Sequence, residues 1–233
     1  MVIAFNGWLD GLTASGIILS TAIFGILSIY KSIKLKAKLL SIAGLAMFFV
    51  GFLWLGPTTD FLFKLISDTN IDPPQYYVYL SYLWVAPALI FAVRLGGELI
   101  MPKKKWLLVG IFLVLGVVFE LYLWFSPNQS FDHIGILEPD GLIDASFNRT
   151  HPTFILVAVF LVSALVLLGI GFAIKAKQST GLLRKKFTYL SIGFIIFVLC
   201  GALDSILTLP VAIGVVRVVM MTFALFMYLG LKT

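Results

Sequence analysis

Long apolar stretches alternate with short polar segments along the whole chain. A helix that crosses a bilayer needs about 20 mostly apolar residues, and seven stretches come close to or meet that length. They cover roughly residues 12–30, 39–56, 76–95, 106–125, 153–174, 187–208 and 211–231. This pattern predicts an all-α fold, a bundle of seven membrane helices that forms one domain over residues 1–233.

The boundaries between these stretches carry helix-breaking or charged residues. A polar stretch opens at Pro57 and ends at Gln75, and Pro102 precedes three lysines. The shortest boundary is Leu209-Pro210. Proline suits the first turn of a helix and disrupts its interior, so this boundary predicts two antiparallel helices joined by a tight turn.

Composition excludes a water-soluble domain. Hydrophobic residues make up 61% of the 233 residues and charged residues 12%, whereas soluble domains average about 45–50% and about 25%. The mean hydropathy is +1.06. The single cysteine, Cys200, excludes a disulfide scaffold. An integral membrane protein of the cell membrane remains.

Basic residues gather at the ends of the first, third, fifth and seventh apolar stretches and in the segments that follow them. The positive-inside rule places such segments in the cytoplasm, so the N-terminus is expected outside and the C-terminus inside. The formal charge of +6 then reports topology, and nucleic-acid binding is not expected. The residues expected at the inner face are Lys31, Lys34, Lys36, Lys38, Arg94, Lys103, Lys104, Lys105, Lys175, Lys177, Arg184, Lys185, Lys186 and Lys232.

The longest external segment runs from Ser126 to Pro152, between the fourth and fifth spans. Within it, two short apolar runs flank Glu138-Pro139-Asp140, a pattern typical of a small β-hairpin. Such a hairpin would cap the bundle; an exposed connector is the alternative. Asn128 and Asn148 each begin a glycosylation acceptor pattern, in agreement with an external position.

The acids and histidines of this external segment do not predict a metal site. Their spacing matches no established ligand pattern, and a solvated acidic loop accounts for them. Nor do the histidines His133 and His151 accompany any acid inside a span. Catalysis is therefore not expected, and no catalytic residue is assigned.

Three ionisable residues lie inside the apolar stretches, namely Glu120, Asp204 and Arg217. An intramembrane charge is costly unless it is paired or hydrated, which makes it a functional candidate. With a rise of about 1.5 Å per residue, all three lie at a similar depth below the external boundary. We expect Arg217 to pair with Asp204, or failing that with Glu120. Such a pair could fix helix register alone, or form part of a ligand pocket.

Aromatic side chains near this depth are candidates for lining such a pocket. Tyr79, Tyr82 and Trp84 lie on the third span, and Tyr228 falls near the Arg217 side of the seventh. Pro87 is expected to kink the third span.

A short pattern recurs in identical register in the second and sixth spans. Leu40-Ser41-Ile42 is followed by Gly51, and Leu190-Ser191-Ile192 by Gly201. This predicts a parallel repeat of three helices, one connector and three helices, a 3+1+3 plan; chance is the alternative, since these residues are common in membrane helices.

In topology and in its aromatic-rich spans the chain resembles the seven-helix sensory domains attached to microbial histidine kinases, and its 3+1+3 plan is similar to that of microbial rhodopsins. The resemblance implies a sensor that binds a small ligand or cation from outside and signals to a partner at the basic loops. It does not extend to retinal, because the seventh span has no lysine before Lys232. No cofactor is expected.

The alternative is a small transporter or channel. The PQ-loop families are similar in having seven spans and parallel repeats. Here, however, Pro74-Gln75 lies in a loop before the third span, whereas those families carry the pair within spans.

Overall fold

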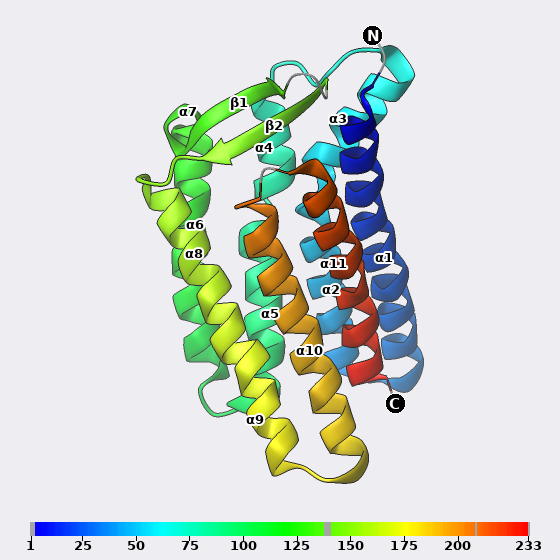
Figure 1. Ribbon diagram of the computed structural model, residues 1–233. Coiled ribbons are helices and arrows are strands. Elements are labelled where there is room, and N and C mark those ends of the chain that lie inside the picture. Colours follow the sequence, from blue (N-terminus) through cyan, green and yellow to red (C-terminus); the bar gives the residue numbers. More distant parts are fainter. Residues whose placement is uncertain (1–2, 138–140, 208, 233) are drawn as a thin grey trace.

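The computed structural model describes residues 3–137, 141–207 and 209–232. Long helices run side by side between two ends, and a β-hairpin lies across one end, near the N-terminus (Figure 1). The C-terminus lies at the opposite end. The longest elements are α1 (Phe5–Leu35), α6 (Lys105–Phe125), α10 (Gly181–Asp204) and α11 (Pro210–Leu231).

Six helical segments of the described chain are long and apolar enough to cross a membrane. They are α1, the α4–α5 pair, α6, the α8–α9 segment, α10 and α11. A seventh span arises if α2 (Lys38–Phe52) and α3 (Leu55–Ser67) count as one, although they are bent by 52°. The chain is thus a multi-pass, helical membrane protein, with six or seven spans.

Two spans break at the residue four positions before a proline. α2 ends before Leu53, and α4 (Gln75–Tyr82) ends before Leu83; Pro57 and Pro87 are each the third residue of the helix that follows. A proline has no N–H to donate to the carbonyl four residues earlier, so both breaks have the same cause. The expected kink at Pro87 is therefore present, where α5 (Val85–Ile100) begins.

The prediction of a polar connector from Pro57 to Gln75 is wrong over the first half of that segment, because residues 55–67 form α3. Pro57 sits in the first turn of α3, where its missing N–H costs nothing. Phe61 is buried against Gly11 of α1, and its ring meets Trp8 edge-on at 5.3 Å. The polar residues Thr58, Asp60 and Lys64 of α3 are buried, and its large apolar side chains other than Phe61 lie mainly on the outer face, so local polarity did not mark a connector here.

The fifth expected span contains a π-helix between α8 (Pro152–Ala164) and α9 (Gly171–Gln178), at Leu165–Ile170. π-helical turns expose backbone carbonyls that an α-helix would pair. Here the Ser191 hydroxyl of α10 donates a hydrogen bond to the Gly169 carbonyl (2.7 Å), deep in the protein.

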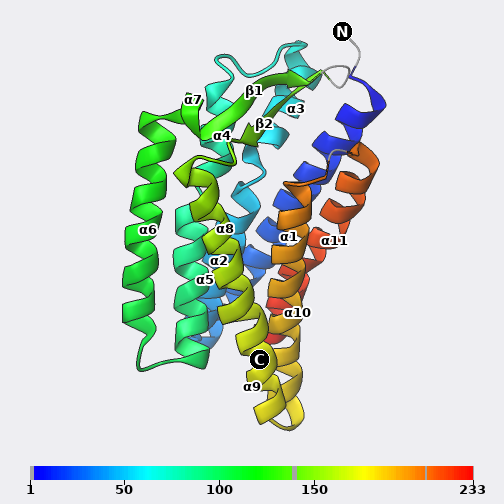
Figure 2. The same ribbon diagram turned by 60° about the vertical axis from the view of Figure 1, so that its left-hand side comes forward.

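The expected hairpin is confirmed. β1 (Phe131–Leu137) pairs antiparallel with β2 (Leu142–Phe147), after the single turn of helix α7 (Pro127–Ser130). The three residues expected at its tip, 138–140, lie outside the described residues. Figure 2 shows the hairpin crossing the ends of several helices. On its underside, Phe131 and Phe147 stack on each other at 4.6 Å and both contact Tyr82 of α4.

The core is divided along the length of the bundle. Phe172, Phe194 and Phe223 centre an apolar cluster toward the end opposite the hairpin, while Phe119, Phe160 and Phe131 centre another beneath the hairpin. Large apolar side chains also cover the outer faces of α1, α6, α8 and α11. A water-soluble protein does not expose such area; in a bilayer these faces contact lipid.

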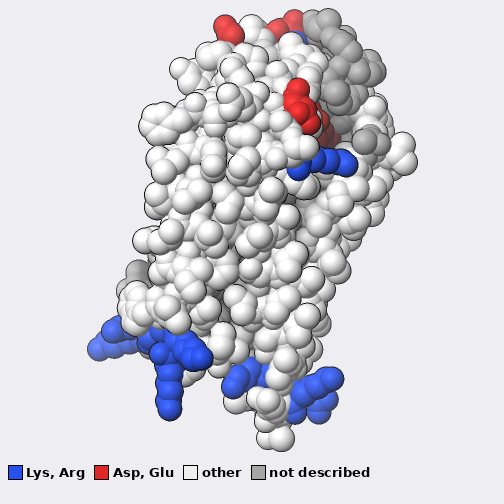
Figure 3. All heavy atoms as spheres, turned by 90° about the vertical axis from the view of Figure 1, so that its left-hand side faces the viewer, with Lys and Arg blue, Asp and Glu red and all other residues white. Residues whose placement is uncertain are grey.

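Charge divides between the two ends. On the face in Figure 3, most Lys and Arg gather at the end opposite the hairpin, Asp and Glu lie toward the hairpin end beside a few basic atoms, and a nearly uncharged belt separates the two ends. We call these the basic end and the hairpin end.

Candidate functional site

Arg217 binds two carboxylates from two other helices. Its Nε lies 2.8 Å from Asp204 Oδ1 at the end of α10, and its Nη1 lies 2.5 Å from Asp10 Oδ1 in α1. Nη1 also donates to the Asp10 carbonyl (3.3 Å). The Arg217 side chain is 9% exposed, that of Asp204 16% and that of Asp10 33%. We refer to Asp10, Asp204 and Arg217 as the triad.

Small residues allow α1 and α11 to approach closely enough for this contact. A Cβ atom at Gly214 would lie 2.8 Å from the Leu9 side chain, and one at Gly16 would overlap Met221. The Ser20 hydroxyl donates to the Met221 carbonyl across the same interface (2.6 Å). Close packing of small residues is a common basis of helix association in membranes, and here it places Asp10 beside Arg217.

The sequence predicted that Asp204 lies inside the sixth span. In the structure it is the last residue of α10, so it lies at the helix end. The partial negative charge at a helix C-terminus disfavours an anion there. The guanidinium of Arg217, two turns below the start of α11 at Pro210, provides the compensating charge. The predicted contact between Arg217 and Asp204 is thus present.

Glu120 does not join the triad. Among the described residues, the carboxylates that pair with Arg217 are those of Asp10 and Asp204. Both carboxyl oxygens of Glu120 are shielded from solvent and have no hydrogen bond of good geometry. The indole of Trp124, one turn along α6, is the polar group that approaches them. The similar depth of the three residues did not translate into proximity.

Of the four aromatic residues expected to line a pocket, only Tyr82 lies near the triad. It packs under the hairpin and is within electrostatic range of Asp204 and Arg217. Tyr79 stacks on Trp124 of α6 at 4.7 Å, and Trp84 packs against Phe49 and Phe52 of α2. Tyr228 lies near the basic end, where the Lys31 ammonium is 5.0 Å from its ring.

Tyr77 and Asp144 belong to the triad's surroundings and were not expected there. The Tyr77 side chain is buried, at 6% exposure, and lies within electrostatic range of Asp10, Arg217 and Asp144. Asp144, on β2, brings a third carboxylate toward the same place. The Asp144 side chain is exposed, but the protein on one side of it partly desolvates the carboxyl and raises its pKa, and Asp10 raises it further. The Ala145 N–H, Arg217 and His133 act in the opposite direction.

A buried aspartate fastens the hairpin to the bundle. Asp60 of α3 is fully buried; its Oδ2 accepts hydrogen bonds from the Ile143 backbone N–H (2.8 Å) and from Asn70 Nδ2 (3.0 Å). Its Oδ1 accepts one from the Ile71 N–H (2.8 Å), and Asn70 Nδ2 also reaches the Gly141 carbonyl (2.9 Å). Three N–H donors satisfy this carboxylate, which fastens β2 to α3 and so keeps Asp144 within electrostatic range of Asp10 and Arg217. We call this arrangement the Asp60 latch.

Part of this site had signals in the sequence. Asp10 lies two residues before the first expected span, with no proline between, so extending that helix to Phe5 would have placed Asp10 in it. Asp60 and Asp144 looked like ordinary external acids. Only the three-dimensional contacts distinguish them.

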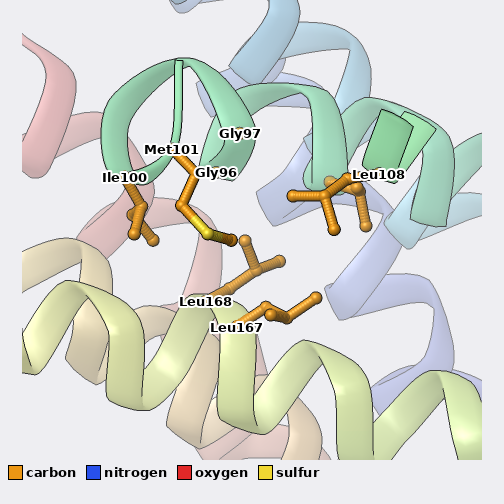
Figure 4. Close-up of a pocket in the computed structure, with 8 residues that line it drawn as sticks. Gly96, Gly97, Ile100, Met101, Leu108, Leu167 and Leu168 are labelled. Atoms are coloured by element: carbon orange, nitrogen blue, oxygen red, sulfur yellow. The ribbon is translucent and has the colours of Figure 1, made fainter. Parts of the chain in front are cut away.

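A second feature lies near the basic end, a small cavity between α5, the start of α6 and the π-helix. It has a volume of about 10 Å³ and an apolar lining that includes Met101, Leu108 and Leu168; Figure 4 shows these side chains around it. This is about the space of one water molecule, and a water needs polar partners. The cavity is therefore a packing gap rather than a ligand site.

Within the described part of the chain, no group of three or more His, Cys, Asp or Glu side chains is arranged to hold a metal ion. Comparison of the chain with protein families, with curated proteins and with solved structures gives no match. The triad, the hairpin and the distribution of charge are therefore the features of the molecule that bear on its function.

Proposed function

We propose that this protein is a receptor-like membrane sensor that binds a small cation, or a small ligand bearing a positive charge, at the triad beneath the hairpin. The observation that carries the proposal is the charge of the site. Two aspartates share one arginine, which leaves one negative charge, and Asp144 is a further carboxylate in range. The aromatic rings of Tyr77 and Tyr82 could add cation–π interactions.

The elements that meet at the triad also reach the basic end. α1 ends beside Lys34 and Lys36, α10 begins near Arg184, and α11 ends before Lys232. A ligand that changes the packing of these three helices at one end would change their packing at the other. This supports a signal passed to a separate partner, recruited by the basic segments.

The proposed orientation places the hairpin end outside the cell membrane and the basic end in the cytoplasm. It follows from the positive-inside rule and from the separation of charge in Figure 3. The ligand would then arrive from outside, where the hairpin covers the triad.

A transporter of the PQ-loop-like class is the alternative, and one observation favours it. The hydroxyls of Ser41 and Ser32 share a hydrogen bond (2.6 Å) between the first two helices. Ser191, in the same register of the proposed second repeat, bonds to the helix that precedes its own. Parallel repeats are common in transporters. Against this, the triad lies toward one end, whereas transporter sites lie near the midplane.

The test is a cation titration of the purified protein in nanodiscs. Melting temperature is measured against sodium, potassium, magnesium, calcium and tetramethylammonium, for the wild type, Asp144→Asn, Asp204→Asn and Asp132→Asn. Asp132 is an exposed aspartate of the same hairpin and serves as the matched control. A saturable rise that Asp144→Asn or Asp204→Asn weakens and Asp132→Asn preserves supports the proposal.

No saturable rise with any cation, or an equal rise in all variants, would contradict cation binding at the triad. Flux of the stabilising cation into liposomes containing the protein would favour the transporter over the sensor.

A further inference from the structure

The outward face of α8 carries a shallow, open groove at the hairpin end, formed between side chains of this one helix and Arg149. It has a volume of about 390 Å³ and is lined by side chains of α8 between Phe154 and Ser163, together with Arg149, which precedes the helix. Ile155, Val159 and Val162 in its lining are among the exposed apolar residues of the outer surface. Since α8 belongs to a membrane span, this groove faces the bilayer.

Arg149 differs from the other two bases at this end. Lys64 pairs with Asp68 at 3.5 Å, and Arg217 is held in the triad. Among the described residues, no carboxylate lies within ion-pair distance of the exposed Arg149. A guanidinium presents paired N–H donors that match the oxygens of a phosphate, so an unpaired one at the mouth of an apolar groove suits a phosphate attached to an apolar chain.

The length of the groove agrees with that ligand. Phe154 and Ser163 are nine residues apart, which at about 1.5 Å per residue corresponds to about 14 Å along the helix. The hydrocarbon layer of a bilayer is about 30 Å thick, so the groove spans about the depth of one leaflet.

We propose that this groove holds one phospholipid of the leaflet on the hairpin side, with its phosphate on Arg149 and an acyl chain along α8 toward Ser163. The proposal is independent of the function proposed for the triad, because it uses none of the triad's residues.

The experiment measures lipid retention by native mass spectrometry of the detergent-purified protein. The probes are dioleoyl phosphatidylglycerol and dioleoylglycerol, which has the same chains and no phosphate. Arg149→Gln removes the phosphate ligand, and Ala158→Phe fills the groove. The controls are Arg184→Gln, an exposed base at the basic end, and Val114→Phe, on the outer face of α6.

We expect one retained phosphatidylglycerol, bound about tenfold more weakly after Arg149→Gln, as expected for loss of about 1.4 kcal/mol of binding energy, and lost after Ala158→Phe. Both controls should retain it, and dioleoylglycerol should not be retained. Equal retention by Arg149→Gln and the wild type, or equal retention of dioleoylglycerol, would overturn the proposal.

Discussion

Arg217 Nη1 lies 2.5 Å from Asp10 Oδ1, and this ion pair joins the last helix of the chain to the first. Because the same guanidinium also holds Asp204, three helices depend on one side chain. Removing one partner of a buried ion pair destabilises a protein far more than removing one partner of an exposed pair.

Arg217→Gln is therefore expected to destabilise the protein strongly. The substitution leaves two carboxylates without their cation, and removing one partner of a buried pair costs about 3–5 kcal/mol. Thermal unfolding in nanodiscs measures the effect, with Arg184→Gln as the exposed control. A melting temperature of Arg217→Gln equal to that of Arg184→Gln would show that the triad contributes no stability.

Loss of the Asp60 latch is expected to free the hairpin without unfolding the helices. Asp60→Asn replaces one carboxyl oxygen by an amide that cannot accept the N–H of Ile71 or Ile143, at a cost of about 1–3 kcal/mol. Hydrogen exchange at Ile143 should accelerate while exchange in α10 stays slow. The control, Asp132→Asn, should leave both unchanged; unchanged exchange at Ile143 in Asp60→Asn would refute the latch.

Glu120→Gln is expected to stabilise the protein. Both carboxyl oxygens are buried without a well-formed hydrogen bond, so the neutral amide removes an ionisable group from the membrane span. A gain of about 1 kcal/mol would raise the melting temperature by about 2–4 °C for a chain of this size.

Glu98→Gln provides the contrast, because Glu98 pairs with Lys105 at 2.8 Å and its loss should lower stability slightly. A melting temperature of Glu120→Gln below that of the wild type would contradict the prediction.

The pH dependence of stability should report Asp144. Its folded-state pKa lies above the ordinary value of 3.8, so its protonation favours the folded state. That contribution is fully present below pH 3.8 and is lost as the pH rises through the folded pKa. In the absence of a bound cation, Asp144→Asn should thus be more stable than the wild type at neutral pH, with the difference disappearing near pH 3.5. A variant that is less stable than the wild type at neutral pH would contradict this sign.

Apolar length predicted most of the membrane helices, because a span must be apolar whatever it packs against. It failed at α3, where Asp60 and Lys64 looked like residues of a loop. Their polarity is satisfied by contacts with Ile143, Asn70 and Asp68, which no local pattern contains.

The candidate site was predictable only where its residues were unusual in their surroundings. Arg217 and Asp204 stood out as charges in apolar stretches and do form a pair. Asp10 and Asp144 lay in segments where acids are ordinary, so their approach to Arg217 depends on how distant elements pack. Glu120 stood out equally, but depth along a helix says nothing about the direction in which a side chain points.

We propose that a cation at the triad changes the packing of helices that end at the basic segments. Hydrogen exchange of the protein in nanodiscs, with and without the cation that raises its melting temperature most, tests this directly. We predict altered exchange both in β2 and at the basic ends of α1, α10 and α11, and neither change in Asp144→Asn. Altered exchange confined to the hairpin, or identical changes in Asp144→Asn and the wild type, would contradict the claim.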